Sequence, residues 1–373
     1  MREEKILIIP RPHIGDFIWA TSAVALLKKS GRQFKITVLS PSSLNELVDN
    51  NRIFDDKITY AISKFESGSM LAKAFYRANL FIKLLFKIRP QKFDLCFLFS
   101  PFPFFTKLAV YLNIGKIIFP EYECCGQNKK SGEYGILGTM LKKDRLLYVE
   151  TQRNADFTHY SEFFQTLVRN FLNSSNMALP AIPSFTGNKD EITALIKTDK
   201  TRKIALCMKA SKTSKNVWPA EYFRQIIQEI SQNVSAAFFI FGGKEQQKYA
   251  DDFIKNLDPS AEAHNLCGKT SLLEIKEICI HLDLLISVDT GIPHIAATTG
   301  INMITLFGFA APDAVMPMSH KNISFYAGIE CSPCVYSLAF EKNQCPYETP
   351  KCMESIKPAD VTKAALAILE RNK

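Results

Sequence analysis

The sequence predicts two α/β domains in tandem, each built on a parallel sheet. Short apolar runs alternate with segments of helical spacing, which is the pattern of a parallel sheet covered by helices on both faces. The alternation lapses over residues 121–160 and restarts after a stretch rich in proline, serine and asparagine. A length of 373 residues also suits two domains better than a single core.

The first half opens with an apolar run, a loop and a helix, and further strands and helices follow it. The predicted strands cover residues 4–9, 34–41, 57–62, 93–101 and 114–120, and the predicted helices cover 16–31, 42–51 and 159–172. The segment 70–92 carries six lysine and arginine residues and no acid. We interpret it as the helix that covers the sheet before the strand at 93–101.

The segment 173–185 has the composition of a linker. We therefore predict one domain at residues 1–178 and a second at residues 179–357. In the second domain, strands are predicted at 203–210, 235–243, 283–289 and 302–308, and helices at 219–232, 245–257, 271–282 and 291–300. A last helix at 358–373 has proline in its first turn.

Charge and composition narrow the class of protein. The net charge of +9 favours anionic partners, which include phosphates, nucleic acid and acidic membrane surfaces. No apolar run reaches the length of a membrane span, and the first apolar run is too short for a signal peptide. Ten cysteines without an export signal indicate reduced thiols or a metal site rather than a disulfide scaffold. We expect a cytoplasmic protein.

Polar residues stand at the end of the predicted strand 283–289, where open α/β sheets bind ligands. They are Asp289, Thr290, Gly291 and His294. A glycine at a helix N-terminus allows a phosphate to approach the backbone closely. In isolation the same residues are also typical of a helix cap and a buried core histidine.

Two further strand ends complete a predicted nucleotide pocket. A loop dense in cations and hydroxyls suits a diphosphate, although a solvated basic loop has the same composition. Glu245, after the strand 235–243, can accept hydrogen bonds from ribose hydroxyls. The basic loop contains Lys209, Ser211, Lys212, Thr213, Ser214 and Lys215.

Four stretches of the sequence resemble the heptosyltransferases, the glycosyltransferase group typified by ADP-heptose:lipopolysaccharide heptosyltransferases. They are ILIIPRPHIGDFIWATSAVALLKK, SKNVWPAEYF, DLLISVDTGIPHIAATTG, and CSPC followed by CM. The resemblance runs in order through most of the chain. It implies the GT-B fold, in which two Rossmann-like domains face each other across a cleft, with the donor nucleotide on the C-terminal domain and the acceptor on the other. It also implies that the helix at 358–373 crosses back to the N-terminal domain.

The resemblance gives roles to the strand-end residues. It implies that Asp289, Thr290, Gly291 and His294 hold the donor diphosphate and the sugar next to it. It places Ser211, Lys212 and Thr213 in the diphosphate loop, Glu245 near the ribose and Thr270 near the adenine.

The chain departs from the family at two places. Asn216 stands where the family has lysine, so that Lys215 is shifted by one position. The run FGFAAPDA replaces a Pro-Thr-Asp-Pro run. Both departures leave the identity of the donor sugar open.

Asp16 stands at the first strand–helix junction, where an acid can either cap the helix or act as a base. The resemblance identifies it with the catalytic aspartate that takes the acceptor proton during transfer with inversion. Lys212 or Lys215, with the helix terminus at Gly291, would neutralise the leaving diphosphate. Catalysis is therefore expected to need no cofactor.

The expected reaction is transfer of heptose from ADP-heptose to a lipopolysaccharide core or a related glycan. Two alternatives remain: a relative that uses another nucleotide sugar or a protein acceptor, and a catalytically idle nucleotide-binding homologue. The expected acceptor is a lipid-linked oligosaccharide, and nucleic acid is not an expected partner. The basic segment 70–92 also suits a peripheral contact with the inner face of the inner membrane.

Four cysteines form the pattern C-x2-C-x10-C-x6-C within 22 residues. Four thiolates at such spacing can close a tetrahedral site for zinc or iron. The alternative is a set of reduced structural thiols or adventitious disulfides. Because we expect the segment to lie away from the strand ends that carry the donor loops, we predict a structural metal rather than a catalytic one. Some branches of the resembling family look to carry such a site. The cysteines are Cys331, Cys334, Cys345 and Cys352.

Overall fold

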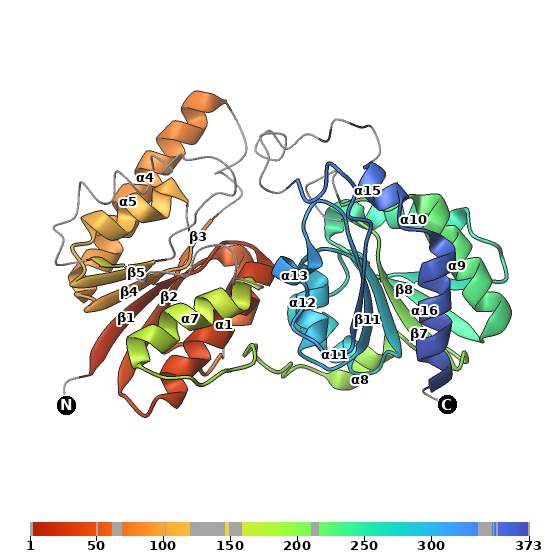
Figure 1. The fold of residues 1–373 in the computed structure, drawn as a ribbon, viewed down its shortest axis with the longest axis horizontal. Coiled ribbons are helices and arrows are strands. Elements are labelled where there is room, and N and C mark those ends of the chain that lie inside the picture. Colours follow the sequence, from red (N-terminus) through yellow and green to blue (C-terminus); the bar gives the residue numbers. More distant parts are fainter. Residues whose placement is uncertain are drawn as a thin grey trace. The chain divides into compact units, whose positions relative to one another are not determined.

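The chain forms two compact α/β units. The computed structural model describes residues 3–49, 51–61, 69–100, 102–119, 146–148, 159–209, 216–334, 345, 347 and 350–371. The units are Met1–Pro183 and Ser184–Lys373, so the division falls within the segment 173–185. Each unit contains a parallel sheet with helices on both faces (Figure 1). The predicted α/β class is confirmed.

The sheet of the first unit has the strand order β3-β2-β1-β4-β5-β6, and all paired strands are parallel. The chain begins in the middle of the sheet, builds one side and then the other, which creates a switch point at the carboxyl end of β1. The elements are β1 Glu4–Ile9, α1 Ile14–Lys29, β2 Phe34–Pro41, α2 Asn45–Val48, β3 Asp56–Tyr60, α4 Met70–Ile88, β4 Leu95–Leu98, α5 Pro103–Tyr111, β5 Lys116–Phe119, β6 Leu146–Tyr148 and α7 Tyr160–Leu172.

Helices α1 and α7 lie side by side on one face of this sheet, and α4 and α5 cover the other (Figure 1). The hydroxyls of Ser22 and Ser161 join α1 to α7 at 2.9 Å. On the opposite face, α4 packs Leu80, Leu84 and Ile88 into the core. The interpretation of segment 70–92 as a covering helix is confirmed.

The sheet of the second unit has the order β12-β11-β10-β7-β8-β9, again with parallel pairs. The elements are α8 Lys189–Ala194, β7 Arg202–Cys207, α9 Ala220–Asn233, β8 Ala236–Ile240, α10 Gln247–Lys255, β9 Glu262–Asn265, α11 Leu272–Cys279, β10 Leu284–Val288, α12 Gly291–Ala297, β11 Asn302–Phe307, α13 Pro312–Val315, β12 Asn322–Tyr326, α15 Lys351–Glu354 and α16 Pro358–Arg371.

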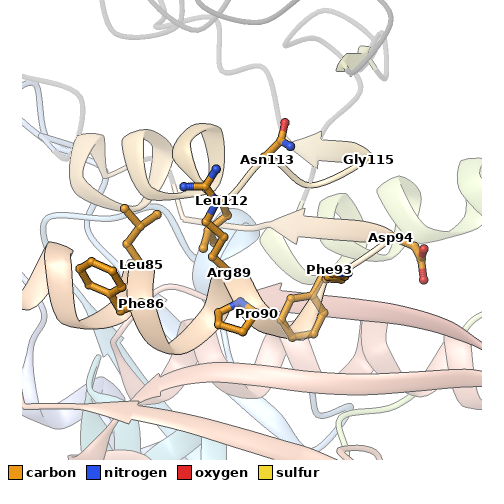
Figure 2. Close-up of a pocket in the computed structure, with 10 residues that line it drawn as sticks. Leu85, Phe86, Arg89, Pro90, Phe93, Asp94, Leu112, Asn113 and Gly115 are labelled. Atoms are coloured by element: carbon orange, nitrogen blue, oxygen red, sulfur yellow. The ribbon is translucent and has the colours of Figure 1, made fainter.

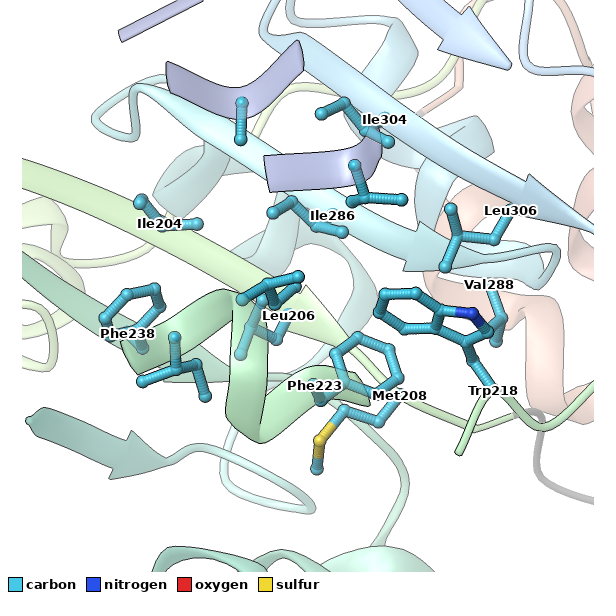
Figure 3. Packing of buried hydrophobic residues seen from close by; sticks show 14 of the residues in the cluster. Ile204, Leu206, Met208, Trp218, Phe223, Phe238, Ile286, Val288, Ile304 and Leu306 are labelled. Atoms are coloured by element: carbon cyan, nitrogen blue, oxygen red, sulfur yellow. The ribbon is translucent and has the colours of Figure 1, made fainter. Parts of the chain in front are cut away.

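The strands of the second unit send alternate side chains into two hydrophobic clusters. Ile204 and Leu206 of β7 enter the cluster beneath α9, α10 and α16, which is shown in Figure 3. Ala205 and Cys207, between and after them, enter the cluster beneath α8 and α11. This period of two explains why central strands read as uninterrupted apolar runs, because both of their faces are buried.

Three short strands escaped the sequence analysis, and all three are edge strands. They are β6 in the first sheet and β9 and β12 in the second. The sequence of β9 is the polar run EAHN, and β12 is only partly buried. An edge strand has one neighbour and needs less apolar cover, so its pattern is weak.

Helix α16 belongs to the core of the second unit. It packs against α9 and contacts β10 and β11. Its side chains Val361, Ala365 and Leu369 are buried in the same hydrophobic cluster as Ile204 and Leu206. The sequence predicts that residues 358–373 return to the N-terminal domain; that contact stays a prediction.

Among the helices that the structure describes, none combines the length and apolar composition that crossing a membrane requires.

Candidate active site

The described donor residues predicted from the sequence follow four adjacent strands of the second sheet. Asp289 follows β10, Lys209 follows β7, Glu245 follows β8 and Thr270 follows β9. Because the strands are parallel and neighbouring, their carboxyl ends form one continuous edge. Ser211, Lys212, Thr213 and Lys215 lie outside the described residues.

The loop after β10 presents a hydroxyl that is not used for capping. Thr290 occupies the N-cap position of α12, yet its side chain makes no capping hydrogen bond. Its Oγ1 is buried and has no hydrogen-bond partner among the described residues. An unpaired buried hydroxyl is costly in a resting fold, which favours a role in holding a ligand. Gly291 then begins α12, and His294, one turn later, is 4% exposed.

Asn216 joins the loop after β7 to the loop after β10. Its side-chain Nδ2 donates a hydrogen bond of 2.6 Å to the backbone oxygen of Asp289, and the residue is 2% exposed. A bridge between Lys209 and Val217 brings together the two ends of the segment between them. The sequence identified Asn216 only as a departure from lysine, and its bracing role was missed.

We predict that Asn216→Ala weakens the affinity for ADP by about fivefold to tenfold, because a buried hydrogen bond contributes about 1 kcal/mol and the loop would loosen. Titration calorimetry measures this affinity. Asn233→Ala is the matched control, since Asn233 makes a similar amide-to-carbonyl bond with Glu229 at the exposed end of α9. Equal ADP affinity in both variants and the wild type would show that the hydrogen bond from Asn216 to the loop after β10 does not contribute to nucleotide binding.

Gln246 makes a second brace. Its Nε2 donates to the backbone oxygen of Lys209 at 2.7 Å, and its Oε1 accepts from the backbone N–H of Gly243 at 3.1 Å. The exposed carboxylate of Glu245 folds over Gly243, where a Cβ would lie 2.5 Å from both carboxylate oxygens. Glycine at position 243 therefore permits the position that Glu245 adopts.

Thr270 reaches this edge through a glycine turn. Gly268 has a φ of +69°, and a Cβ there would lie 2.7 Å from the Cα of Lys244. Such a backbone conformation and close approach both require glycine. Thr270 Oγ1 is buried and has no hydrogen-bond partner in the described part of the chain.

In the first unit, Asp16 is not the helix cap. Helix α1 begins at Ile14 with His13 at the N-cap position, so Asp16 lies inside the first turn. Its Oδ1 pairs with Nη1 of Arg11 at 3.2 Å, and the side chain is 14% exposed. The carboxylate is therefore held in place while part of it stays accessible.

Aromatic rings support this ion pair. The guanidinium of Arg11 lies 5.0 Å from the ring centroid of Tyr160, and that ring stacks on Trp19 at 5.8 Å. Sequence reasoning missed both Arg11 and Tyr160, because their contact joins the first loop to α7 across 149 residues of chain.

Two serines flank β1 at the same edge. Ser40 of β2 and Ser100 after β4 have buried hydroxyls without hydrogen-bond partners among the described residues. Each is followed by proline, in the runs VLSP and LFSP. The Ser-Pro pair that ends both apolar runs is the sequence feature from which polar residues at this edge of the sheet could have been predicted.

The cysteine segment gathers at the carboxyl end of β11. Ser332 Oγ donates to the backbone oxygen of Gly308, and the N–H of Cys334 donates to that of Phe309 at 3.0 Å. A Cβ at Gly308 would lie 3.0 Å from Cys352 Sγ. Burial, with a smaller effect of Cys331, Cys334 and Cys345, raises the pKa of the Cys352 thiol to about 11.

The expected separation of these cysteines from the donor loops is wrong, because β11 pairs with β10, the strand that leads to Asp289. The eight cysteines that the structure describes form no disulfide. Among the same described residues, no three histidine, cysteine or acidic side chains meet closely enough to hold a metal ion. The metal site remains a prediction.

Known proteins with similar sequences are heptosyltransferases. Lipooligosaccharide heptosyltransferase 2 of Campylobacter jejuni is 28% identical over 166 residues, which covers 44% of this chain and 50% of that protein. The chain thus spans about half the length of the curated relatives it matches.

Solved structures show the same fold over nearly the whole chain. The Escherichia coli ADP-heptose lps heptosyltransferase II has a TM-score of 0.72 at 16% identity and covers 99% of both chains. The iron-containing dodecameric glycosyltransferase TibC of E. coli has a TM-score of 0.54 at 10% identity, covering 99% of this chain and 80% of TibC. With two parallel-sheet α/β units in this chain, these matches confirm the predicted GT-B fold.

The family model described as glycosyltransferase family 9 (heptosyltransferase) matches residues 144–344, which is more than half of the chain. That span contains every donor residue and two of the four clustered cysteines named above, Cys331 and Cys334. The resemblance read from the sequence motifs is confirmed: the chain belongs to glycosyltransferase family 9, the heptosyltransferases.

Proposed function

We propose that the protein is an inverting glycosyltransferase that moves heptose from ADP-heptose to a lipopolysaccharide or lipooligosaccharide core. The single observation that carries this proposal is the row of loops at the carboxyl ends of β10, β7, β8 and β9 in a chain of family 9. The hydroxyls of Thr290 and Thr270 in that row have no hydrogen-bond partner among the described residues, which favours a polar ligand.

The proposed reaction forms one bond and breaks one. The acceptor hydroxyl attacks the anomeric carbon of the heptose from the face opposite the diphosphate, and the bond from that carbon to the diphosphate oxygen breaks. Asp16 takes the hydroxyl proton as general base, and ADP leaves. Arg11 orients the Asp16 carboxylate through their ion pair.

On the donor side, we assign the diphosphate and the adjoining sugar to Asp289, Thr290, Gly291 and His294, with Ser211, Lys212, Thr213 and Lys215. Cationic side chains and backbone N–H groups would stabilise the charge that develops on the leaving diphosphate. Glu245 and Thr270 are assigned to the ribose and the adenine. These roles need no metal at the reacting atoms.

A panel of donors separates this proposal from its alternatives. Release of ADP from ADP-heptose should require a lipopolysaccharide core acceptor, and ADP-glucose or UDP-sugars should release little nucleotide. Preference for another nucleotide sugar would identify a relative of different specificity. Tight ADP binding without turnover on any donor and acceptor would identify an idle homologue.

We further propose that transfer takes place in the cytoplasm, on a lipid-linked oligosaccharide acceptor. Solved structures of the E. coli heptosyltransferase WaaC, which has this fold, hold ADP or ADP-2-deoxy-2-fluoro heptose. The proposed acceptor class is supported by the similarity of this chain to lipooligosaccharide heptosyltransferase 2 and lipopolysaccharide heptosyltransferase 2.

We also propose a structural zinc or iron ion held by Cys331, Cys334, Cys345 and Cys352. Four thiolates match the donor preference of both ions. The Cys331–Cys334 turn and Cys352 both lie against the Gly308–Phe309 segment, which supports the grouping. TibC, which is named as iron-containing, shares the fold.

Protein purified under reducing conditions should contain about one equivalent of zinc or iron per chain. Elemental analysis should show this metal lost in Cys334→Ser, with a lower melting temperature because the ion would no longer tie the Cys331–Cys334 turn to Cys345 and Cys352. Cys279→Ala is the matched control, since Cys279 is buried in the other hydrophobic cluster of the second unit. Metal-free wild type with four titratable thiols in this segment would contradict the proposal.

A further inference from the structure

Helix α4 carries a second apolar face that the core does not use. Leu71, Phe75, Ile82 and Phe86 are 84%, 75%, 52% and 75% exposed. At 3.6 residues per turn these four side chains fall within an arc of about 60°. The residues of α4 that enter the core, Leu80, Leu84 and Ile88, point to the opposite side. We call the four exposed residues the α4 stripe.

The α4 stripe is a continuous feature. Its ends are 15 residues apart, which corresponds to roughly 22 Å along the helix axis. Scattered exposed apolar side chains are ordinary on a protein surface, whereas a contiguous row of large ones indicates a surface that becomes covered.

The surroundings of the α4 stripe are uniformly basic. Residues 70–92 contain six lysine and arginine residues and no acid. Lys83 and Lys87 are exposed on the flank of the stripe, and Arg89 and Lys92 are exposed just beyond its end. Long basic side chains beside an apolar row can keep their charges at a polar surface while the row enters an apolar layer.

A cavity of about 670 Å³ opens at the end of the α4 stripe. Figure 2 shows Leu85 and Phe86 of α4, and Arg89 just after it, lining the cavity together with Leu112 and Asn113, which follow α5. Lys92 adds a second cation. The one acidic residue that lines the cavity is Asp94, and its carboxylate accepts a hydrogen bond of 2.9 Å from the backbone N–H of Lys5.

We propose that the α4 stripe docks on the surface of an anionic phospholipid bilayer. The four apolar side chains enter the boundary between headgroups and acyl chains, and the neighbouring cations bind lipid phosphates. The cavity lined by Phe86, Arg89 and Lys92 accepts one headgroup phosphate. This inference rests on the first unit alone and does not depend on the transfer reaction.

The charge pattern favours a bilayer over a second copy of the chain. Two copies pairing through the α4 stripe would bring Lys83 and Lys87 of each helix towards those of the other. The like charges on that flank oppose such pairing, and no acid in residues 70–92 is present to compensate them. An anionic membrane supplies the complementary charge.

Vesicle co-sedimentation of the full chain, without donor or acceptor, tests the proposal. Wild type should bind vesicles of phosphatidylethanolamine and phosphatidylglycerol, and bind phosphatidylcholine vesicles weakly. Phe75→Ser and Phe86→Ser should each lower the partition coefficient by about tenfold, the loss expected when a buried aromatic side chain is removed. Leu179→Ser is the matched control, because Leu179 is also 75% exposed but lies outside α4.

Substitutions of lysine test separately how much electrostatic attraction contributes to vesicle binding. Lys83→Gln and Lys87→Gln should each weaken binding to the anionic vesicles by about fivefold, and added salt should reduce the difference. An unchanged melting temperature and an unchanged circular dichroism spectrum would confirm that all variants fold.

Three results would overturn the proposal: equal binding of wild type to both vesicle types, no effect of the two phenylalanine variants, or a dimer that those variants dissociate while vesicle binding persists. A failure of sugar transfer would leave this test unaffected.

Discussion

Asp16→Asn is expected to lower kcat for heptose transfer by about 10² to 10⁴-fold, the usual contribution of a general base. The amide oxygen can still accept the hydrogen bond from Arg11, so the loop should keep its geometry, but the amide cannot take the acceptor proton. Affinity for ADP should not change, because the nucleotide is assigned to the second unit. Single-turnover transfer and calorimetry measure the two quantities.

Asp190→Asn is the control for this experiment. Asp190, like Asp16, lies in the first turn of a helix, but it is exposed on α8. Transfer at the wild-type rate by Asp16→Asn would remove Asp16 from the chemistry and leave it as a surface partner of Arg11. A parallel loss in ADP binding would instead show that the substitution disturbs the fold.

Asp289→Ala and His294→Ala are each expected to lower kcat/KM for ADP-heptose by about 10² to 10³-fold. The Asp289 carboxylate would accept hydrogen bonds from the sugar hydroxyls, and the His294 imidazole would donate to the leaving diphosphate. Part of this loss should appear as weaker ADP binding. His294 is nearly buried, so the melting temperature of its variant must be measured as well.

His281→Ala supplies the control, because His281 lies beside Glu277 and is 41% exposed. Unchanged nucleotide binding and turnover in both donor-site variants would reduce Asp289 to a loop residue and His294 to a core residue. A lower melting temperature with normal turnover in His294→Ala would assign that histidine to packing.

The central strands could be predicted because burial on both faces forces an apolar composition. The runs around Ile204 and Ile286 are therefore visible in the sequence, while the polar β9 at the sheet edge is not. The strand-end motif at Asp289 could be found for a related reason. Few loops place an acid, a hydroxyl and a glycine directly after such a run.

The braces around the site could not be predicted in this way. Asn216 acts on a backbone oxygen 73 residues away, and Arg11 contacts a ring on α7. Both contacts depend on which strands become neighbours, which hydrophobic periodicity does not determine. The position of the cysteines beside the end of β11 could not be predicted for the same reason. The chain that carries them returns to β11, a strand that precedes it in sequence.

We expect the protein to transfer one heptose residue from ADP-heptose to a lipid-linked core oligosaccharide. Mass spectrometry of the acceptor, after incubation with ADP-heptose and the purified full chain, tests it most directly. We predict an acceptor that gains the mass of one heptosyl residue in step with ADP release, with inverted anomeric configuration in the product, and no gain with Asp16→Asn. An unmodified acceptor alongside intact ADP-heptose, under conditions where ADP itself binds, would contradict the account.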